Sequence, residues 1–451
     1  MTEAFMSDQN EIPSGRRGFL KGSLLAGASL AASLKPAKAE ASFFDIPQGL
    51  PMTQLFTDET SAQFRILVDP EFPVVYQITS SDGHNPLIES IARTQNPYDQ
   101  RDCMEHLLVT GLSLKAAYTL KIFENGREID SRNFRALDTR KPNGRFALVS
   151  CMMDLLTPIQ GYMWEAMERA KPDVVFIIGD ASYADVGGNG SIESNWSRHV
   201  QSRRALDLYY WKDLIPVVAT WDDHDYAGDN ATKNHPLNGQ SIKVFQAMFA
   251  FTPRPSASLG PGVASLVELF GQRFYLMDDR TWRDEWNAPQ GLHWGNQQED
   301  WLFKSLASST KPAWLLNGSQ YFGAYLEKDS FEGRHPFQFK RVLERLRSIE
   351  APVVFGSGDV HFSELMRIEK SLLGYETFEV TSSSMHSMTA PWINIRKTNP
   401  RRIATTWHYN FVVAQADVSH AGRIDFHALS VGKDLAIYFD QRASVVRRER
   451  R

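Results

Sequence analysis

Two segments near the N-terminus alternate apolar and polar residues, as a half-buried β-strand does. They are residues 64–68 and 117–122, and the second segment places Tyr118, Leu120 and Ile122 on one face. Asn125-Gly126 follows directly and predicts a hairpin turn. No helical periodicity of useful length occurs between residues 42 and 140. This pattern predicts a small N-terminal β-sandwich over residues 42–140.

Beyond a polar, turn-rich linker at residues 139–144 the pattern changes. Short apolar runs alternate with longer amphipathic stretches, which indicates α/β architecture over residues 141–440. The predicted strands are 146–149, 174–178, 215–220, 274–277, 313–316 and 352–355. The predicted helices are 161–170, 242–251, 296–307 and 337–348.

The composition excludes several classes of protein. With 42% hydrophobic and 23% charged residues, the chain is neither disordered nor fibrous. No apolar run approaches the roughly 18–20 residues of a membrane span. The formal net charge of −4 gives no electrostatic argument for nucleic-acid binding. Only Cys103 and Cys151 occur, so a disulfide framework is excluded.

Residues 1–39 have the features of a twin-arginine signal peptide. Arg16 and Arg17 precede Phe19-Leu20-Lys21, and residues 22–34 form an apolar stretch too short to cross a bilayer. Ala37-Lys38-Ala39 fits a cleavage site. The alternative is a disordered basic N-terminus. We expect the twin-arginine translocation machinery to export the folded protein to the periplasm or the cell exterior, a route often used for metalloproteins.

Each of the six predicted α/β strands is followed by a polar cluster. Ligands bind beyond the carboxyl ends of strands in such sheets, so we expect the clusters to line one pocket. Asp180, Asp222, Asp223 and Asp359 would repel one another there unless cations neutralised them. Carboxylates suit hard cations, whereas a thiolate and a phenolate suit ferric iron. The pattern therefore predicts a metal site.

The motifs and their order resemble the alkaline phosphatase D (PhoD) family. They are Ser150-Cys151, Gly179-Asp180-x-x-Tyr183, Trp221-Asp222-Asp223-His224 and Gly358-Asp359-Val360-His361. This family belongs to the calcineurin-like metallophosphoesterases, and residues 179–185 also resemble a loop of purple acid phosphatases. The resemblance implies an α/β fold with two β-sheets sandwiched between helices. A small fibronectin- or Ig-like sandwich, with Tyr118 as its corner tyrosine, would precede it.

The resemblance implies an iron site formed by three side chains. Cys151 stands where most metallophosphoesterases have Asp, and it would bind ferric iron as a thiolate. Tyr183 would bind the same ion through its phenolate, and Asp180 would bridge two metals. Taken alone, Cys151 beside Val149 and Met152 is also an ordinary core thiol. Tyr183 is equally consistent with simple packing.

A second metal site is implied at Asp223, Asp359 and His361. Asp223 replaces an Asn of the superfamily motif, Asp359 replaces the first His of Gly-His-x-His, and His361 matches the second His. Calcium is the ion that the resemblance implies, and other divalent metals stay open. Asn195 and Asn317 are candidates for one further ligand.

His224 and Asp223 are the expected catalytic residues. His224 would contact the phosphate or the leaving group as a general acid or a charge stabiliser. Arg280 would either clamp the phosphate or form a salt bridge. Asp222 would either contact metal or cap a turn. Asp225 replaces the Glu often found in the family and reaches one methylene less far.

We therefore expect a secreted, metal-dependent phosphoesterase that hydrolyses phosphate mono- or diesters by attack of a metal-activated hydroxide. One alternative is an inactive binding protein with a metallophosphatase-like domain. A second alternative is a metal-dependent nuclease, although the sequence shows no basic groove.

Overall fold

The computed structural model describes residues 49–98, 101–155, 159–288, 290–323, 330–396 and 399–447. The predicted signal peptide lies outside these residues. No helix among the described residues is both long and apolar enough to cross a membrane.

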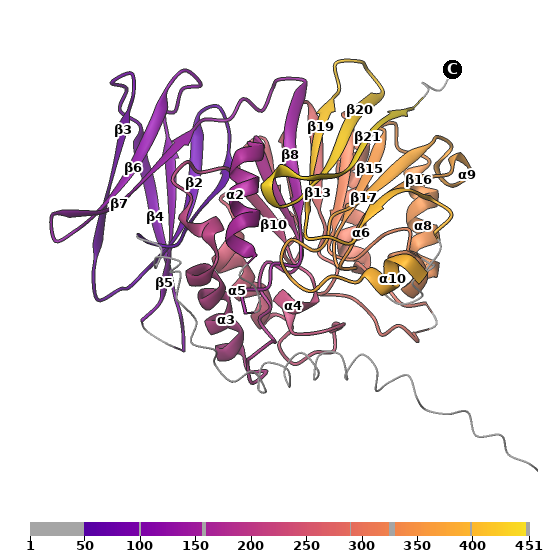
Figure 1. The fold of residues 1–451 in the computed structure, drawn as a ribbon, viewed down its shortest axis with the longest axis horizontal. Helices are drawn as coiled ribbons and strands as arrows, with labels where there is room; N and C mark the ends of the chain where they lie inside the picture. The colour runs from indigo at the N-terminus through magenta and orange to yellow at the C-terminus, as the bar shows by residue number, and fades with distance from the viewer. Residues whose placement is uncertain are drawn as a thin grey trace, which may run out of the picture. The chain divides into compact units, whose positions relative to one another are not determined.

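The N-terminal region consists of two antiparallel sheets, with strand orders β1-β2-β5-β4 and β3-β6-β7 (Figure 1). Their strands are β1 (Met52–Thr57), β2 (Ser61–Val68), β3 (Val74–Ser80), β4 (Leu87–Gln95), β5 (Cys103–Thr110), β6 (Ala117–Glu124) and β7 (Arg127–Arg135). Asn125 and Gly126 join β6 to β7 with positive φ angles of 50° and 79°, as the hairpin prediction requires. Phe64 meets Phe134 at a ring-centroid distance of 5.0 Å, so the two sheets share a core.

The second region contains a six-stranded sheet, β10-β9-β8-β19-β20-β21, and an eight-stranded sheet, β11-β12-β13-β14-β15-β17-β16-β18. Strands β8 (Asn143–Val149), β9 (Val174–Ile178) and β10 (Val217–Thr220) are parallel in the first sheet. Strands β13 (Gln272–Leu276), β14 (Ala313–Asn317) and β15 (Val353–Ser357) are parallel in the second. All six predicted strands are confirmed. The four predicted helices are confirmed as α2 (Gln160–Ala170), α5 (Gln240–Phe249), α6 (Gly295–Ala307) and α8 (Pro336–Leu346).

Strand β9 is apolar at every position because both of its faces are buried. Phe176 of β9 belongs to the core between the sheets, where its ring lies 4.7 Å from that of Phe274. Its neighbours Val175 and Ile177 point the other way and join a second core that includes Trp164 of α2. The mixed α/β expectation is therefore correct.

The remaining elements were not predicted. They are β11 (Ala257–Leu259), β12 (Ser265–Leu269), β16 (Ser363–Ile368), β17 (Thr377–Thr381), β18 (Arg402–Thr406), β19 (Phe411–Asp417), β20 (Arg423–Val431) and β21 (Ile437–Val446), with the helices α3 (Ile192–Ala205), α4 (Asp223–Tyr226), α7 (Phe331–Arg334), α9 (Lys370–Leu373) and α10 (Pro391–Arg396). Short 3-10 turns occur at Asp207–Tyr210 and Lys433–Leu435.

Contacts continue across the expected domain boundary near residue 140. Arg65 of β2 donates a hydrogen bond from Nη2 to the Ala250 carbonyl at 2.6 Å. Gln63 donates from Nε2 to the Thr252 carbonyl at 2.9 Å. The N-terminal sheets are thus tied to the segment that follows α5.

Candidate metal centre

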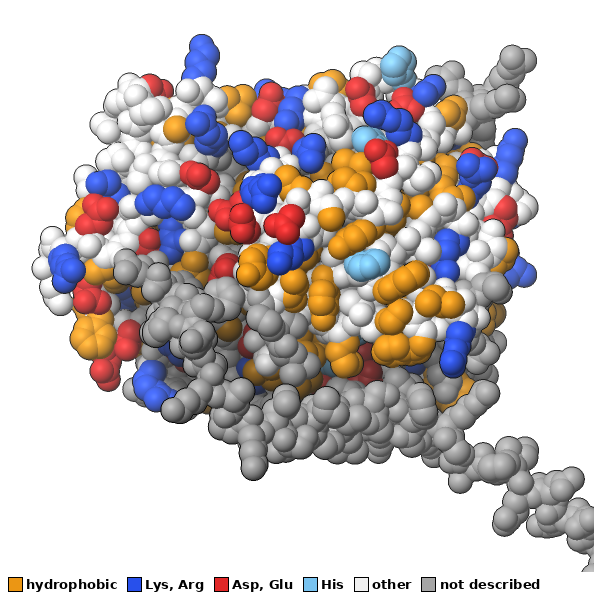
Figure 2. All heavy atoms as spheres, in the orientation of Figure 1, with side chains coloured by type: hydrophobic (Ala, Val, Ile, Leu, Met, Phe, Trp, Pro, Cys, Tyr) orange, Lys and Arg blue, Asp and Glu red, His pale blue; other side chains and the backbone are white. Residues whose placement is uncertain are grey.

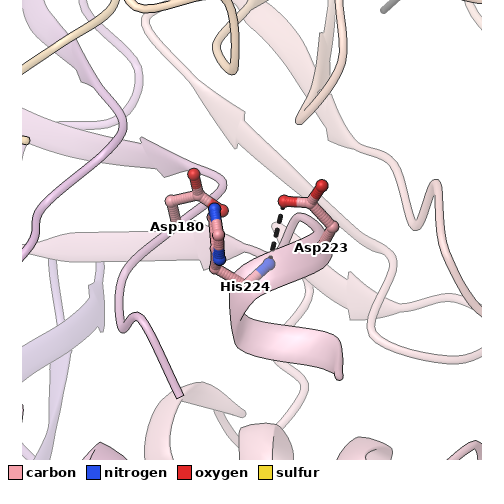
Figure 3. Close-up of side chains that lie close together, drawn as sticks. All are labelled: Asp180, Asp223 and His224. Atoms are coloured by element: carbon pink, nitrogen blue, oxygen red, sulfur yellow. Dashed lines mark hydrogen bonds between the residues drawn. The ribbon is translucent and has the colours of Figure 1, made fainter. Parts of the chain in front are cut away.

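Two groups of metal-ligating atoms lie where the parallel strands end. Asp180, Asp223 and His224 form the first group, and Asp222, Asp223 and Asp359 form the second. Within each group the candidate ligand atoms lie within 4.8 Å of one another, and Asp223 belongs to both. Figure 3 shows Asp180 in the loop after β9, facing Asp223 and His224 on α4. The carboxylates expected to converge therefore do so.

The backbone turns sharply at the strand ends that carry these groups. Cys151, Asp180, Asp359 and His361 all have left-handed conformations, with φ angles of 58°, 53°, 67° and 60°. Residues with a Cβ atom adopt this region at a cost of roughly 1–3 kcal/mol, and such strain is concentrated at functional sites. The four residues follow the ends of β8, β9 and β15, so the turns occur where the proposed ligands lie.

Glycines make room for Asp222 at the same place. A Cβ atom on Gly179 would lie 2.7 Å from the Asp222 Cβ atom, and one on Gly318 would lie 2.6 Å from its Cγ atom. Both approaches are too close for any side chain. The loops after β9 and β14 can therefore enclose Asp222 only because both positions are glycine.

Cys151 and Tyr183 pack together beside Asp180, and both are buried. The Cys151 Sγ atom lies 3.6 Å from Oδ2 of Asp180 and 3.0 Å from Oγ of Ser383. Among the described residues, Tyr183 Oη and Asp180 Oδ1 have no hydrogen-bond partner. Buried polar atoms are rarely left in this state without a ligand or water.

Burial raises the pKa of the Cys151 thiol well above its usual value, and the charge of Asp180 raises it further. The pKa of the Tyr183 phenol is raised well above its usual value by burial and by Cys151 and Asp180. A coordinating cation reverses this preference, because it stabilises the thiolate and the phenolate directly. A thiolate, a phenolate and a carboxylate are donors that suit a ferric ion. Cys151 is not a member of either of the two ligand groups.

His224 is held by two neighbours from the same loop. Its ring stacks on Tyr183 at a centroid distance of 4.1 Å, and its Nδ1 atom lies 2.8 Å from Oδ1 of Asp185. Burial lowers the pKa of His224, but Asp180, Asp223 and Asp185 raise it well above its usual value. The three carboxylates therefore favour the protonated form of the ring.

Asp185 is a site residue that the sequence analysis did not assign. It ends the loop of residues 179–185. Its position two residues after Tyr183 was the available signal, but spacing alone does not show that its side chain turns back to His224.

Arg280 pairs with Asp222 in the interior of the site, and each side chain is 1% exposed. The guanidinium also lies 3.7 Å from Oδ2 of Asp223 and 3.6 Å from Oδ1 of Asp279. The salt-bridge alternative for Arg280 is therefore present in the structure. A phosphate-binding role would fall to Nη1, which has no hydrogen-bond partner among the described residues.

Asp225 connects two loops of the site through hydrogen bonds and is not part of either ligand group. Its carboxylate accepts hydrogen bonds from the backbone N–H groups of Ser182 at 2.7 Å, Ala181 at 3.1 Å and Asp222 at 3.2 Å. The shorter side chain at this position thus joins the loop after β9 to the start of α4.

The two amide candidates also have structural partners. Asn195 donates to the Asp225 carbonyl at 3.3 Å. Asn317 accepts a hydrogen bond from Trp294 Nε1 at 3.0 Å and donates to Asp279 Oδ2 at 3.2 Å.

His361 lies at the edge of the site and outside both ligand groups. Its Nδ1 atom donates to the Met388 carbonyl at 2.6 Å, which leaves Nε2 as the nitrogen that can bind a metal. Burial lowers the pKa of His361, which favours the neutral ring that a metal requires.

The family model described as "PhoD-like phosphatase" matches residues 146–430, a range that contains every candidate site residue. The chain belongs to the PhoD-like phosphatase family. The resemblance predicted from the motifs is thereby confirmed.

Relatives of this PhoD-like phosphatase are consistent with the assignment. The chain is 28% identical over 340 residues to "Alkaline phosphatase D" of Bacillus subtilis (strain 168). This match covers 62% of the chain and 56% of the relative, so the chain spans little more than half of that protein's length. A solved structure titled "Structure of PhoD" matches with a TM-score of 0.64 at 21% identity. It covers 88% of this chain and 93% of the solved chain, which supports the same fold.

Proposed function

We propose that this PhoD-like phosphatase is an exported, metal-dependent phosphoesterase that hydrolyses phosphate mono- or diesters. The observation that carries the proposal is the pair of ligand groups that share Asp223, namely Asp180, Asp223 and His224 in one and Asp222, Asp223 and Asp359 in the other. Carboxylates this close repel one another strongly, and cations relieve the repulsion. An inactive binding protein would have no physical reason to keep such an arrangement.

The donor atoms divide into two sets of different chemistry. Cys151, Tyr183 and Asp180 offer sulfur, phenolate and carboxylate ligands, which we assign to ferric iron. Asp223, Asp359 and His361 would hold the second ion, for which the oxygen-rich set suits calcium. Asp222 contributes negative charge, but Arg280 already neutralises it.

Cations bound in these positions would neutralise the phosphoryl oxygens and lower the pKa of a bound water towards about 7. His224 belongs to the first group and is next to Asp223, which both groups share, and its Nδ1 atom lies 2.8 Å from Oδ1 of Asp185. Its Nε2–H would protonate the departing oxygen, a contribution of roughly 10²–10⁴-fold. Asp185 orients the ring through its contact with Nδ1.

We also assign the N-terminal strands to a fibronectin-like sandwich. Tyr118, near the start of β6, accepts a hydrogen bond from the Ser113 N–H at 2.7 Å. A tyrosine bonded to the backbone a few residues upstream is a feature of such sandwiches.

Hydrolysis assays test the proposed function directly. The purified enzyme should release 4-nitrophenol from 4-nitrophenyl phosphate, from bis(4-nitrophenyl) phosphate or from both, and a chelator should abolish the release. Activity that survives complete removal of metal would overturn the proposal. Cleavage of DNA or RNA in preference to both small esters would favour the nuclease alternative instead.

A further inference from the structure

Helix α10 presents large hydrophobic side chains to solvent. Trp392 is 53% exposed and Ile395 is 65% exposed, and Met388, just before the helix, is 38% exposed. We call these three residues the α10 rim. Figure 2 shows hydrophobic side chains gathered around the place that α10 occupies in Figure 1. Grouped apolar side chains on a protein surface commonly mark a binding site.

The buried side of the same segment is hydrogen-bonded to the loop that carries His361. The Met388 carbonyl accepts a hydrogen bond from Nδ1 of His361 at 2.6 Å, and the Ala390 N–H donates to the His361 carbonyl at 3.0 Å. Ala390 also packs with Val360 and Phe362. These residues flank His361 in sequence, so the rim begins at the edge of the proposed metal centre.

A further bond fixes the orientation of α10. Asn394, on its buried side, donates from Nδ2 to Oγ1 of Thr405 on β18 at 2.6 Å. Trp392 and Ile395 are therefore held outward by the anchoring of the opposite side. A preformed apolar surface of this kind binds a hydrophobic group without first having to order the chain.

The chemistry of the pocket determines what the rim can hold. A phosphate ester consists of a charged phosphoryl group, which would bind the cations, and an organic group, which must lie beside them. The proposed metal centre is rich in carboxylates, which are unfavourable neighbours for a hydrocarbon. The apolar surface next to His361 supplies the missing contact.

We propose that the α10 rim binds the hydrophobic alkyl or aryl group of the phosphate ester, so that the enzyme prefers esters of apolar alcohols. This inference rests on the proposed function and extends it to a substrate class. Each methylene placed against Trp392 and Ile395 leaves water, and the gain accumulates along the chain.

The test compares a methyl ester with the corresponding hexyl ester. If the enzyme hydrolyses monoesters, the pair is methyl and n-hexyl phosphate. If it hydrolyses diesters, the pair is methyl and n-hexyl 4-nitrophenyl phosphate, which share 4-nitrophenol as the leaving group. Concentrations stay below those at which the esters aggregate. The wild-type kcat/KM should be about tenfold higher for the hexyl ester, a modest share of the transfer free energy of five methylenes. In the Trp392→Ala/Ile395→Ser variant this ratio should fall to about twofold.

Phe72→Ala is the matched control, because Phe72 is 50% exposed but lies between β2 and β3, away from the rim. It should leave the hexyl-to-methyl ratio unchanged. Equal wild-type kcat/KM values for the two esters would overturn the rim proposal while the proposed function stands, and this result needs no variant. Failure of the wild type to hydrolyse any ester would overturn both.

Discussion

Arg280 and Asp222 form an ion pair in which both side chains are almost completely buried. Arg280 comes from the segment after β13, and Asp222 immediately precedes α4, so the pair connects the two sheets at the proposed metal centre. It places a permanent positive charge beside Asp223 and Asp359. The protein thereby neutralises one carboxylate of the cluster by itself.

Replacement of Arg280 by Gln should destabilise the protein strongly. It leaves Asp222 buried without its partner, which typically costs about 3–5 kcal/mol. Urea unfolding of the purified enzyme measures the change. The Arg280→Gln/Asp222→Asn double variant should recover part of the loss, because the second change removes the unpaired charge. A single variant within about 0.5 kcal/mol of the wild type would show that the pair has no structural role.

Asp180→Asn should abolish hydrolysis while the fold is retained. An amide supplies no negative charge, so it cannot replace a carboxylate that bridges two cations. We expect less than about a tenth of the wild-type kcat/KM, which corresponds to more than about 1.4 kcal/mol of lost transition-state stabilisation. Circular dichroism checks the fold, and elemental analysis checks the metal content. A variant with near-wild-type activity would exclude Asp180 as the bridge.

The parts of the fold that follow from the sequence are those with a strong hydrophobic pattern. The run at β9 is apolar at every position and is flanked by Asp173 and Gly179, so its bounds were predicted without error. Helix α3 was missed because its buried side carries Asn195, Arg198, His199 and Arg203. Hydrophobic periodicity does not detect a helix whose buried side is polar.

Prediction of the site from the sequence was limited in a similar way. The motifs predicted which carboxylates converge, because each follows a strand end in one architecture. They did not decide between the two alternatives for Arg280 and for Asp222. That choice depends on a contact between residues 58 positions apart, which the sequence order does not specify.

Stability should fall in mild acid, and His106 should contribute to the fall. Burial and the charge of Arg65 lower the pKa of His106 from 6.5 to about 4. Between these values the unfolded chain binds a proton that the folded protein does not, so stability decreases as the pH falls from 6.5 towards 4. The contribution approaches about 1.4 kcal/mol per pH unit.

His106→Gln isolates this contribution. The variant keeps a polar group near Gln63, which lies 2.9 Å from Nε2 of His106, but it does not titrate. In urea unfolding at pH 7, 6 and 5, the free energy of unfolding of the variant should rise relative to that of the wild type as the pH falls. Parallel curves would mean that His106 titrates alike in the folded and unfolded states.

Replacement of Arg16 and Arg17 by Lys should keep the precursor in the cytoplasm. The substitution conserves charge, and the twin-arginine machinery reads the arginine pair as an address. Cell fractionation and immunoblotting distinguish the two locations. Normal export of the Lys-Lys precursor would refute the twin-arginine assignment, whereas export lost for both proteins would point to a defect in the host machinery.

The iron assignment predicts that the native enzyme is coloured. Tyr183 packs against Cys151, whose Sγ atom lies 3.6 Å from Asp180, so three donors of the proposed iron site are neighbours. A phenolate or thiolate bound to ferric iron absorbs visible light by charge transfer from ligand to metal. Calcium and zinc give no such band, because neither ion accepts the electron.

Tyr183→Phe should therefore bleach or strongly shift the band. The substitution removes one oxygen atom that has no hydrogen-bond partner among the described residues, so thermal stability should change little. Tyr209→Phe is the matched control. This tyrosine is also buried, and its hydroxyl has no hydrogen-bond partner in the described part of the chain, but it packs against Arg203, outside the proposed iron site. It should keep the colour. Absorption spectra and iron analysis of enzyme purified from its native host provide the measurement. A colourless, fully active enzyme without iron would remove the Cys151–Tyr183 site and leave an ordinary dimetal centre on the carboxylates.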